Sequence, residues 1–224
     1  MTPRGPLLVT GFDAFANVER NVSGELAAAH DGRWLGGMSV VGRRLRVSWT
    51  SAWEELRTHI DSLHPAGILM LGVAYSPFVR LEVLAMNAAF PEADVEGAVP
   101  ADLALRRIDP SAAAGYWSTL DLDHLERRLR DNDAIWAAPG TAGRVGVTRW
   151  AGAGSYLCNF VYFCALRDFS VQLPIAFVHI PSVEYFATKE PLFLESNLTE
   201  AVSSLVENVA QMIRAGERDG CAAR

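Results

Sequence analysis

The sequence has no excess of basic charge and no long apolar run. Its 224 residues include 20 Lys and Arg against 26 Asp and Glu, a formal net charge of -6, which argues against nucleic acid as the main partner. The first apolar run, at residues 7–11, is too short for a signal peptide or a membrane span. The sequence therefore predicts a cytoplasmic protein that acts on neither nucleic acid nor a membrane.

Cysteine is sparse. The three cysteines stand at positions 158, 164 and 221, without a CxxC pair and without a spacing that could complete a zinc site with nearby histidines. We therefore expect neither a disulfide framework nor a zinc site. Cys164 lies within an apolar stretch and is expected in the core, whereas Cys221 belongs to a polar tail over residues 217–224.

The pattern of apolar residues indicates one globular domain over residues 1–224. Half of the residues are hydrophobic and 21% are charged, and a chain of this length can bury a sizeable core. Strands are predicted over 7–11, 38–49, 67–72 and 175–179, with a further extended segment over 80–87. Helices are predicted over 23–30, from a cap at residue 50 or 51 to residue 63, and over 122–130, 159–167 and 197–215. This alternation predicts an α/β fold, a three-layer α/β/α sandwich around a mostly parallel central sheet.

Two stretches show no sustained periodicity. Residues 90–115 contain three prolines, five acidic residues and an alanine-rich run, which predicts a long, mobile loop. Residues 140–154 are punctuated by five glycines and are expected to be irregular.

Cys158 is the strongest candidate for a functional residue. It follows a glycine-rich turn at residues 151–155 and opens an apolar helix. A helix N-terminus favours the thiolate form of a cysteine, and its unpaired amides can receive an oxyanion. Position alone favours a small buried structural residue about equally, because free cysteine is among the most buried residue types.

His179 and Glu82 are the candidate partners of this cysteine. In parallel sheets, sites lie at the carboxyl ends of strands, and this rule selects residues 11–12, residues 72–82 and His179. Glu82 stands in an apolar stretch, where a carboxylate needs a partner. The alternatives are a hydrogen-bonded core histidine, and a glutamate that pairs with Arg80 or faces water at a sheet edge. Cysteine, histidine and an acid are the parts of a thiol-acylation triad, although spacing does not show that they meet.

Several motifs occur in order along nearly the whole chain. They are VTGFDAF at 9–15 with NVS at 21–23, Gly72, then Glu82 followed by Asn87, YWSTL at 116–120, AGSYLCN at 153–159 and FVHIP at 177–181. Together they resemble the type I pyroglutamyl peptidases, also called pyrrolidone-carboxylate peptidases. The corresponding family motifs read VTGF-x-x-F, N-P-S, ERVAIN, YFSTL, AGTYLCN and FIHIP.

The resemblance implies a cysteine peptidase that removes an N-terminal pyroglutamyl residue from peptides through an acyl-enzyme, without a metal or a cofactor. Cys158 would be the nucleophile, His179 the general base and acid, and Glu82 the group that orients the imidazole. The family is usually oligomeric, which implies a homo-oligomer, a dimer or a tetramer.

The resemblance also implies residues that bind the substrate. A pyroglutamyl ring is flat, uncharged and largely apolar, so two aromatic side chains can sandwich it. Phe12 and Phe15 match the family positions with that role, and Asn21 is a further candidate for substrate binding. From the residues alone, the two phenylalanines fit a hydrophobic core about as well.

The chain departs from the family pattern at three places beside the expected site. At one of them, WAG at 150–152 replaces a short polar stretch of the family, which changes the approach to the nucleophile. After Gly72 it reads VAYS at 73–76 where the family has Gln and a Gly-Gly-Arg stretch, and AAFPE at 88–92 lacks the family's arginine. Arg80 or Arg144 is a candidate to take the place of that arginine. These departures keep two alternative functions open: a weak or inactive family member that binds pyroglutamyl or other capped peptides, and an amidase for small lactams.

Overall fold

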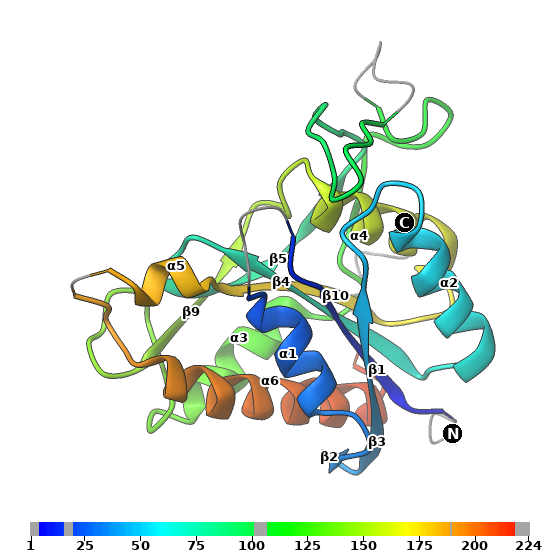
Figure 1. The fold of residues 1–224 in the computed structure, drawn as a ribbon. Helices are drawn as coiled ribbons and strands as arrows, with labels where there is room; N and C mark the ends of the chain where they lie inside the picture. Colours follow the sequence, from blue (N-terminus) through cyan, green and yellow to red (C-terminus); the bar gives the residue numbers. More distant parts are fainter. Residues whose placement is uncertain (1–4, 16–19, 101–106, 189, 218–224) are drawn as a thin grey trace.

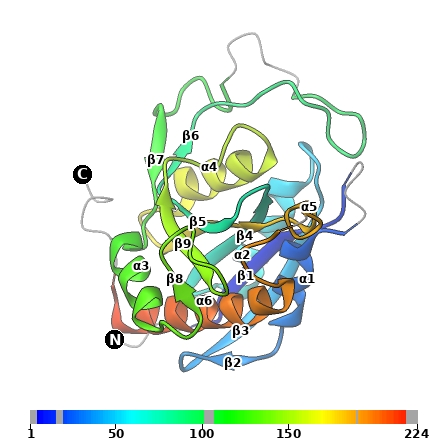
Figure 2. The ribbon, with the colours of Figure 1, turned by 90° about the vertical axis from the view of Figure 1, so that its left-hand side faces the viewer.

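An eight-stranded sheet runs through the middle of the protein in a computed structural model, which describes residues 5–15, 20–100, 107–188 and 190–217. The strand order is β2-β3-β1-β4-β10-β5-β9-β8, and most of these strands are labelled in Figure 1. A separate two-stranded sheet pairs β6 with β7, which are labelled with β8 in Figure 2. The strands are β1 (Leu7–Phe12), β2 (Trp34–Leu35), β3 (Met38–Leu45), β4 (Gly67–Ala74), β5 (Phe78–Glu82), β6 (Leu84–Met86), β7 (Gly115–Trp117), β8 (Trp136–Ala137), β9 (Val145–Trp150) and β10 (Ile175–Pro181). The helices are α1 (Val22–Ala29), α2 (Ala52–Leu63), α3 (Leu122–Asp131), α4 (Leu157–Phe169), α5 (Val183–Phe186) and α6 (Glu195–Ala215).

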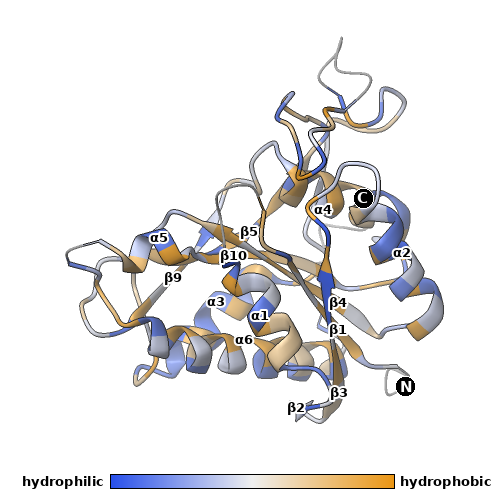
Figure 3. Cartoon of the chain, in the orientation of Figure 1, coloured by the Kyte–Doolittle hydropathy of each residue, from blue (hydrophilic) through white to orange (hydrophobic). Residues whose placement is uncertain are grey.

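Helices cover both faces of the main sheet. Helices α2 and α4 share an apolar cluster with Leu8, Met70 and Phe177 on one face. Helices α1, α3 and α6 share a second cluster with strand residues such as Leu71 and Val178 on the opposite face. Figure 2 shows α4 and α6 on opposite sides of the strands, and Figure 3 shows apolar central strands beneath the polar outer surface of α2. The predicted three-layer α/β/α architecture is confirmed.

The direction of the strands reverses between β10 and β5. Strands β3, β1, β4 and β10 are parallel neighbours, whereas β10 and β5 are antiparallel. The register places Glu82 opposite Phe177 and Arg80 opposite His179. Because directly opposed residues of an antiparallel pair project from the same face, these four side chains share the face that α4 covers. The rule of carboxyl ends therefore selects His179 correctly, but it is the antiparallel register that brings Glu82 to it.

The strongly patterned elements form as predicted. The apolar runs at 7–11, 67–72 and 175–179 lie in β1, β4 and β10, and the five predicted helices correspond to α1, α2, α3, α4 and α6. The strand predicted over 38–49 is shorter, since β3 ends at Leu45. Beyond it, the amide of Trp49 donates to Oδ2 of Asp94 at 2.8 Å and not to a neighbouring strand.

The expectation of an irregular segment over 140–154 is wrong for its centre. Residues Val145–Trp150 form β9, which pairs with β5 on one side and β8 on the other. Val145 and Val147 alternate as in a strand and are both fully buried. Glycines before, between and after them make this stretch resemble a loop in the sequence. Gly146 allows β9 to lie close to the side chain of Phe78 on β5, because a Cβ at position 146 would be only 3.0 Å from Cβ of Phe78.

The single extended segment predicted over 80–87 is two strands in two sheets. β5 ends at Glu82 in the main sheet, and β6 pairs with β7. Asn159 of α4 fixes the second strand, because its side chain accepts from the amide of Met86 at 2.8 Å and donates to the carbonyls of Met86 and Ala88. Tertiary hydrogen bonds, which have no local sequence signature, cause the break.

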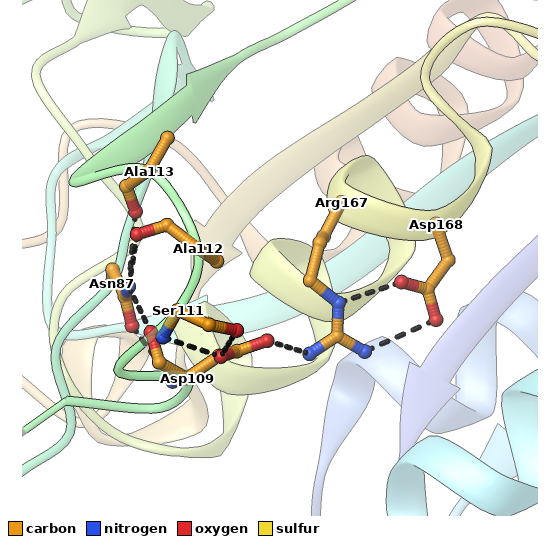
Figure 4. Close-up of polar contacts among 7 residues, drawn as sticks. All are labelled: Asn87, Asp109, Ser111, Ala112, Ala113, Arg167 and Asp168. Atoms are coloured by element: carbon orange, nitrogen blue, oxygen red, sulfur yellow. Dashed lines mark hydrogen bonds and ion pairs between the residues drawn. The ribbon is translucent and has the colours of Figure 1, made fainter.

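The segment 90–115 has no helix or strand over its described residues until β7 begins at Gly115, while residues 101–106 lie outside the described part. Side chains anchor both halves. Asp94 accepts hydrogen bonds from the amides of Glu96 and Ala98, both at 2.9 Å. Asn87 donates to the carbonyl of Asp109, whose carboxylate binds Arg167 of α4 (Figure 4). The mobility of this loop stays a prediction.

Two further expectations concern membrane-spanning segments and the C-terminal tail. Among the described residues, no helix is both long and apolar enough to cross a membrane. The polar tail predicted over 217–224 falls, except for Glu217, outside the described residues, and so does Cys221.

Candidate active site

His179 and Glu82 are joined by a buried hydrogen bond. Nδ1 of His179 donates to Oε1 of Glu82 at 2.8 Å. Glu82 is fully buried and His179 is 8% exposed. The second carboxylate oxygen of Glu82 has no hydrogen-bond partner among the described residues. Such a bond holds the imidazole in one orientation and one tautomer, and leaves Nε2 for another partner.

Cys158 and His179 lie against the same position of β4. A Cβ at Gly72 would lie 3.0 Å from Sγ of Cys158, 3.0 Å from Cδ2 of His179 and 2.9 Å from Cζ of Phe177. Only glycine leaves room for the sulfur and the imidazole ring at these places. The structure thus brings together the cysteine, the histidine and the glutamate that the sequence singles out.

The surroundings of His179 favour its protonated form. Burial is the largest single effect and lowers the pKa of His179, but the charge of Cys158, the hydrogen bond with Cys158 and the interactions with Glu82 together outweigh it. The net result raises the pKa of His179 from 6.5 to about 9. An imidazolium between a sulfur and a carboxylate is the form that can donate a proton to a leaving group.

The start of α4 offers amides to an anion beside Cys158. The amide of Phe160 is the first in the helix that donates to a helical carbonyl, that of Tyr156. No side chain caps this end of the helix. The amides of Leu157, Cys158 and Asn159 therefore have no partner within the helix, and the helix dipole favours negative charge here.

A cavity of about 370 Å³ lies over this end of α4. Its lining follows the strand order across the sheet, from Val47 beyond β3 to Phe12 on β1, Val73 on β4, His179 on β10, Arg80 on β5 and Trp150 on β9. Cys158 lies over the middle of this row, because it contacts the position of Gly72 on β4. The cavity is large enough for a small ligand, and it has an apolar side toward β1 and a side with polar groups toward β5.

Phe12, Phe15 and Asn21, the residues expected to bind substrate, all line the cavity. Phe12 is 4% exposed. The ring of Phe15 lies 6.4 Å from that of Tyr156. The side chain of Asn21 already has protein partners, because its Oδ1 accepts from the amide of Ser23 and its Nδ2 donates to the carbonyl of Asp13. Asn21 therefore caps α1 and shapes the wall of the cavity.

Two aromatic residues of the lining were not selected from the sequence. Tyr156 precedes Leu157 and Cys158 in the AGSYLCN motif, and its hydroxyl donates to the carbonyl of Ala93 at 3.0 Å. Burial, together with the charges of Glu92, Asp94 and Cys158, raises the pKa of Tyr156 to about 12, so the phenol stays neutral. Trp150, which belongs to a departure from the family pattern before the nucleophile motif, lines the cavity from β9, a strand that the sequence pattern does not predict. The motif itself could have pointed to Tyr156.

Arg80 also lines the cavity, whereas Arg144 does not. Arg144 donates to the carbonyl of Asp133 at 2.7 Å. Of the two arginines considered from the sequence, only Arg80 faces the site. No group of three or more metal-binding side chains occurs within the described ranges.

A thiol, an imidazole, a buried carboxylate and free helix amides around one cavity are the parts needed to acylate a cysteine. The class of protein that this fold and site define is a cysteine-type hydrolase. A sequence profile described as pyroglutamyl peptidase matches residues 6–212. The chain belongs to the pyroglutamyl peptidase family.

Curated relatives and solved structures agree with this assignment. The chain is 31% identical over 182 residues to a pyrrolidone-carboxylate peptidase of Thermococcus litoralis, covering 78% of this chain and 76% of the relative. It is 28% identical over 211 residues to a pyrrolidone-carboxylate peptidase of Halalkalibacterium halodurans, covering 91% and 98%. The solved structure of the pyrrolidone carboxyl peptidase from T. litoralis superimposes with a TM-score of 0.81 at 25% identity, covering 96% of this chain and 97% of that chain.

Proposed function

We propose that this protein removes an N-terminal pyroglutamyl residue from peptides. The observation that carries the proposal is the 2.8 Å hydrogen bond from His179 to Glu82, with Cys158 packed beside the same imidazole over Gly72. The names of the relatives, all pyrrolidone-carboxylate peptidases, support the same substrate.

The reaction follows from the charges of the site. Sγ of Cys158, as a thiolate, bonds to the pyroglutamyl carbonyl carbon, and amides at the start of α4 receive the oxyanion. His179 gives its proton to the leaving amine as the carbon–nitrogen bond breaks, which leaves a thioester on Cys158. His179 then takes a proton from water, the resulting hydroxide displaces the sulfur, and pyroglutamate is released. Glu82 keeps the imidazole aligned and stabilises its charge throughout.

The apolar side of the cavity suits the uncharged lactam ring. Phe12, Phe15 and Val47 line that side, and aromatic faces bind a flat ring without charge at little desolvation cost. We assign the acyl group of the substrate to this side. The leaving amine then lies toward His179.

Hydrolysis of pyroglutamyl-7-amino-4-methylcoumarin tests the proposal. The wild type should release the fluorophore, and Cys158→Ala should be inactive. Cys164→Ala is the matched control, because that thiol is 2% exposed and burial raises its pKa to about 12. Iodoacetamide should abolish the activity of the wild type and of Cys164→Ala alike.

A folded wild type without turnover would refute the peptidase function. Tight binding of the uncleaved amide would then identify a binding protein for capped peptides. Hydrolysis of free lactams without cleavage of the peptide amide would identify a lactam amidase.

The location and assembly of the protein are part of the same proposal. We propose that it acts in the cytoplasm on peptides and forms a homo-oligomer, as the family resemblance implies. Light scattering coupled to size exclusion should give a mass that is a multiple of 24.4 kDa. A mass of one chain at micromolar concentration would contradict the oligomer.

A further inference from the structure

Arg80 is a charged group of the cavity that the proposed reaction does not use. It is directly opposite His179 in the antiparallel pairing of β5 with β10, so both side chains leave the sheet on the same face. It also lines the cavity that holds Cys158. An arginine beside the proton donor is therefore within the molecule's binding site.

The guanidinium of Arg80 is held in place by neutral neighbours. Its carbon lies 4.6 Å from the ring centroid of Trp150 and 5.7 Å from that of Phe78. Its Nε donates to Oγ of Ser76 at 3.2 Å. Within the described part of the chain it forms no ion pair, and the one carboxylate nearby on the strand, Glu82, binds His179. The cation–π contact and the hydrogen bond from Nε restrain the guanidinium and leave its two terminal nitrogens as donors for an outside acceptor.

The position of Arg80 across the sheet assigns it to the leaving group. Neighbouring strands lie roughly 4.8 Å apart, so β5 lies roughly 10 Å from β4, over which Cys158 lies. Strand β10, with His179, lies between them. The apolar side of the cavity, at β1, is on the far side of β4 from Arg80. An acyl group on that side directs the leaving amine past His179 toward Arg80.

We propose that Arg80, stacked on Trp150, binds a carboxylate on the residue that follows pyroglutamate. The carboxylate is either the α-carboxylate of a dipeptide substrate or the side chain of an acidic second residue. The shared chemistry is a planar anion beside the scissile amide, which the fork of an arginine binds through two hydrogen bonds. This inference rests on the proposed function and adds a substrate preference to it.

Matched substrate pairs test the preference. One pair is pyroglutamyl-alanine and its C-terminal amide, and the other is pyroglutamyl-glutamate amide and pyroglutamyl-glutamine amide. In the wild type, kcat/KM should be about 10- to 100-fold higher for the charged member of at least one pair, the usual range for a hydrogen bond to a charged group. Preference in the first pair assigns the α-carboxylate, and preference in the second assigns the side chain.

Variants connect the preference to Arg80. Arg80→Met keeps an unbranched stem against Trp150 and should reduce the ratio to about 1, and Arg80→Lys should retain part of it. Arg144→Met is the matched control, since Arg144 lies outside the cavity, and its ratio should equal that of the wild type. Melting temperatures verify that each variant is folded.

Three results would overturn the proposal. Ratios near 1 for both pairs in the wild type would show that no carboxylate is bound. A ratio that persists in Arg80→Met would assign the preference to another residue. An equal fall of kcat for all four substrates in Arg80→Met would show that Arg80 acts on the reacting carbonyl instead. A wild type that hydrolyses the neutral amides without preference refutes only this inference, whereas one that hydrolyses no pyroglutamyl substrate refutes the proposed function itself.

Discussion

Gly72→Ala should separate the geometry of the triad from the chemistry of its members, because it adds one methyl group and changes no functional group. The new Cβ would lie 2.9 to 3.0 Å from Phe177, Cys158 and His179. Carbon atoms in contact prefer roughly 3.5 to 4.0 Å, so the sulfur and the imidazole have to move by about 0.5 to 1 Å. Phe177 is fully buried and His179 is 8% exposed, so these two rings have little room for an inexpensive shift, whereas the sulfur of Cys158 can move only toward the cavity that it lines.

The expected loss follows from that displacement. Overpacking of this kind costs roughly 1 to 3 kcal/mol of stability. A displacement near 1 Å in reacting groups costs about 100-fold in rate, equivalent to about 2.7 kcal/mol of barrier. We expect kcat for the coumarin substrate to fall by about that factor. KM should change much less, because Phe12 and Phe15 lie on the side of β1.

Gly67→Ala is the matched control on the same strand. Its Cβ would lie 2.5 Å from Cδ1 of Ile213 and 3.0 Å from Cγ of Pro174, so it also crowds the core but at the end of β4 that is remote from Cys158. It should lower the melting temperature and keep kcat within about twofold of the wild type. A folded Gly72→Ala enzyme with wild-type kcat would refute the geometry on which the triad rests.

Three further predictions concern the same site and its support. Because the imidazolium is the proton donor and the pKa of His179 is raised to about 9, activity should persist from neutral pH and fall as pH rises through about 9; a fall centred near 6.5 would contradict this. Glu82→Gln removes the buried negative charge, so the alkaline fall should move to lower pH and kcat should drop roughly 100- to 10,000-fold; an unchanged pH profile would show that Glu82 does not act on the imidazole. Asn87→Ala removes the part-buried hydrogen bonds that hold the backbone of Asp109 and Ala113, and it should lower the free energy of unfolding by about 1 to 2 kcal/mol in urea titrations. Ser111→Ala removes one exposed hydrogen bond to Asp109 and should cost less than half as much; an equal loss in the two variants would contradict this.

The elements that sequence reasoning places correctly are those whose signal is local. The strands at the N-terminus, at 67–72 and before His179 are short apolar runs bounded by glycine or proline, and α6 carries a regular apolar stripe. Strand β9 is not predicted, because the glycines in and around it resemble those of a loop. It forms a strand by pairing with β5 and β8. Pairing between distant segments has no local pattern.

Within the site, the sequence by itself determined the chemistry. A cysteine at the start of an apolar helix, a histidine at the end of a buried strand and a glutamate in an apolar stretch are each unusual enough to be selected from one chain. Phe12 and Phe15 are selected as substrate-binding residues only through the family motif at 9–15. Residue types and local periodicity are sufficient for this step, because each residue's peculiarity is visible among its near neighbours.

Only the tertiary structure decided which of these residues meet and what else surrounds them. The antiparallel register of β10 with β5 brings Glu82 to His179, and the bare backbone of Gly72 admits Cys158 beside the same ring. That register also directs Arg80 into the cavity, where β9 supplies Trp150. Contacts between segments that lie about 70 to 100 residues apart depend on strand order and direction, which arise from the burial of the whole core and not from any one stretch of sequence.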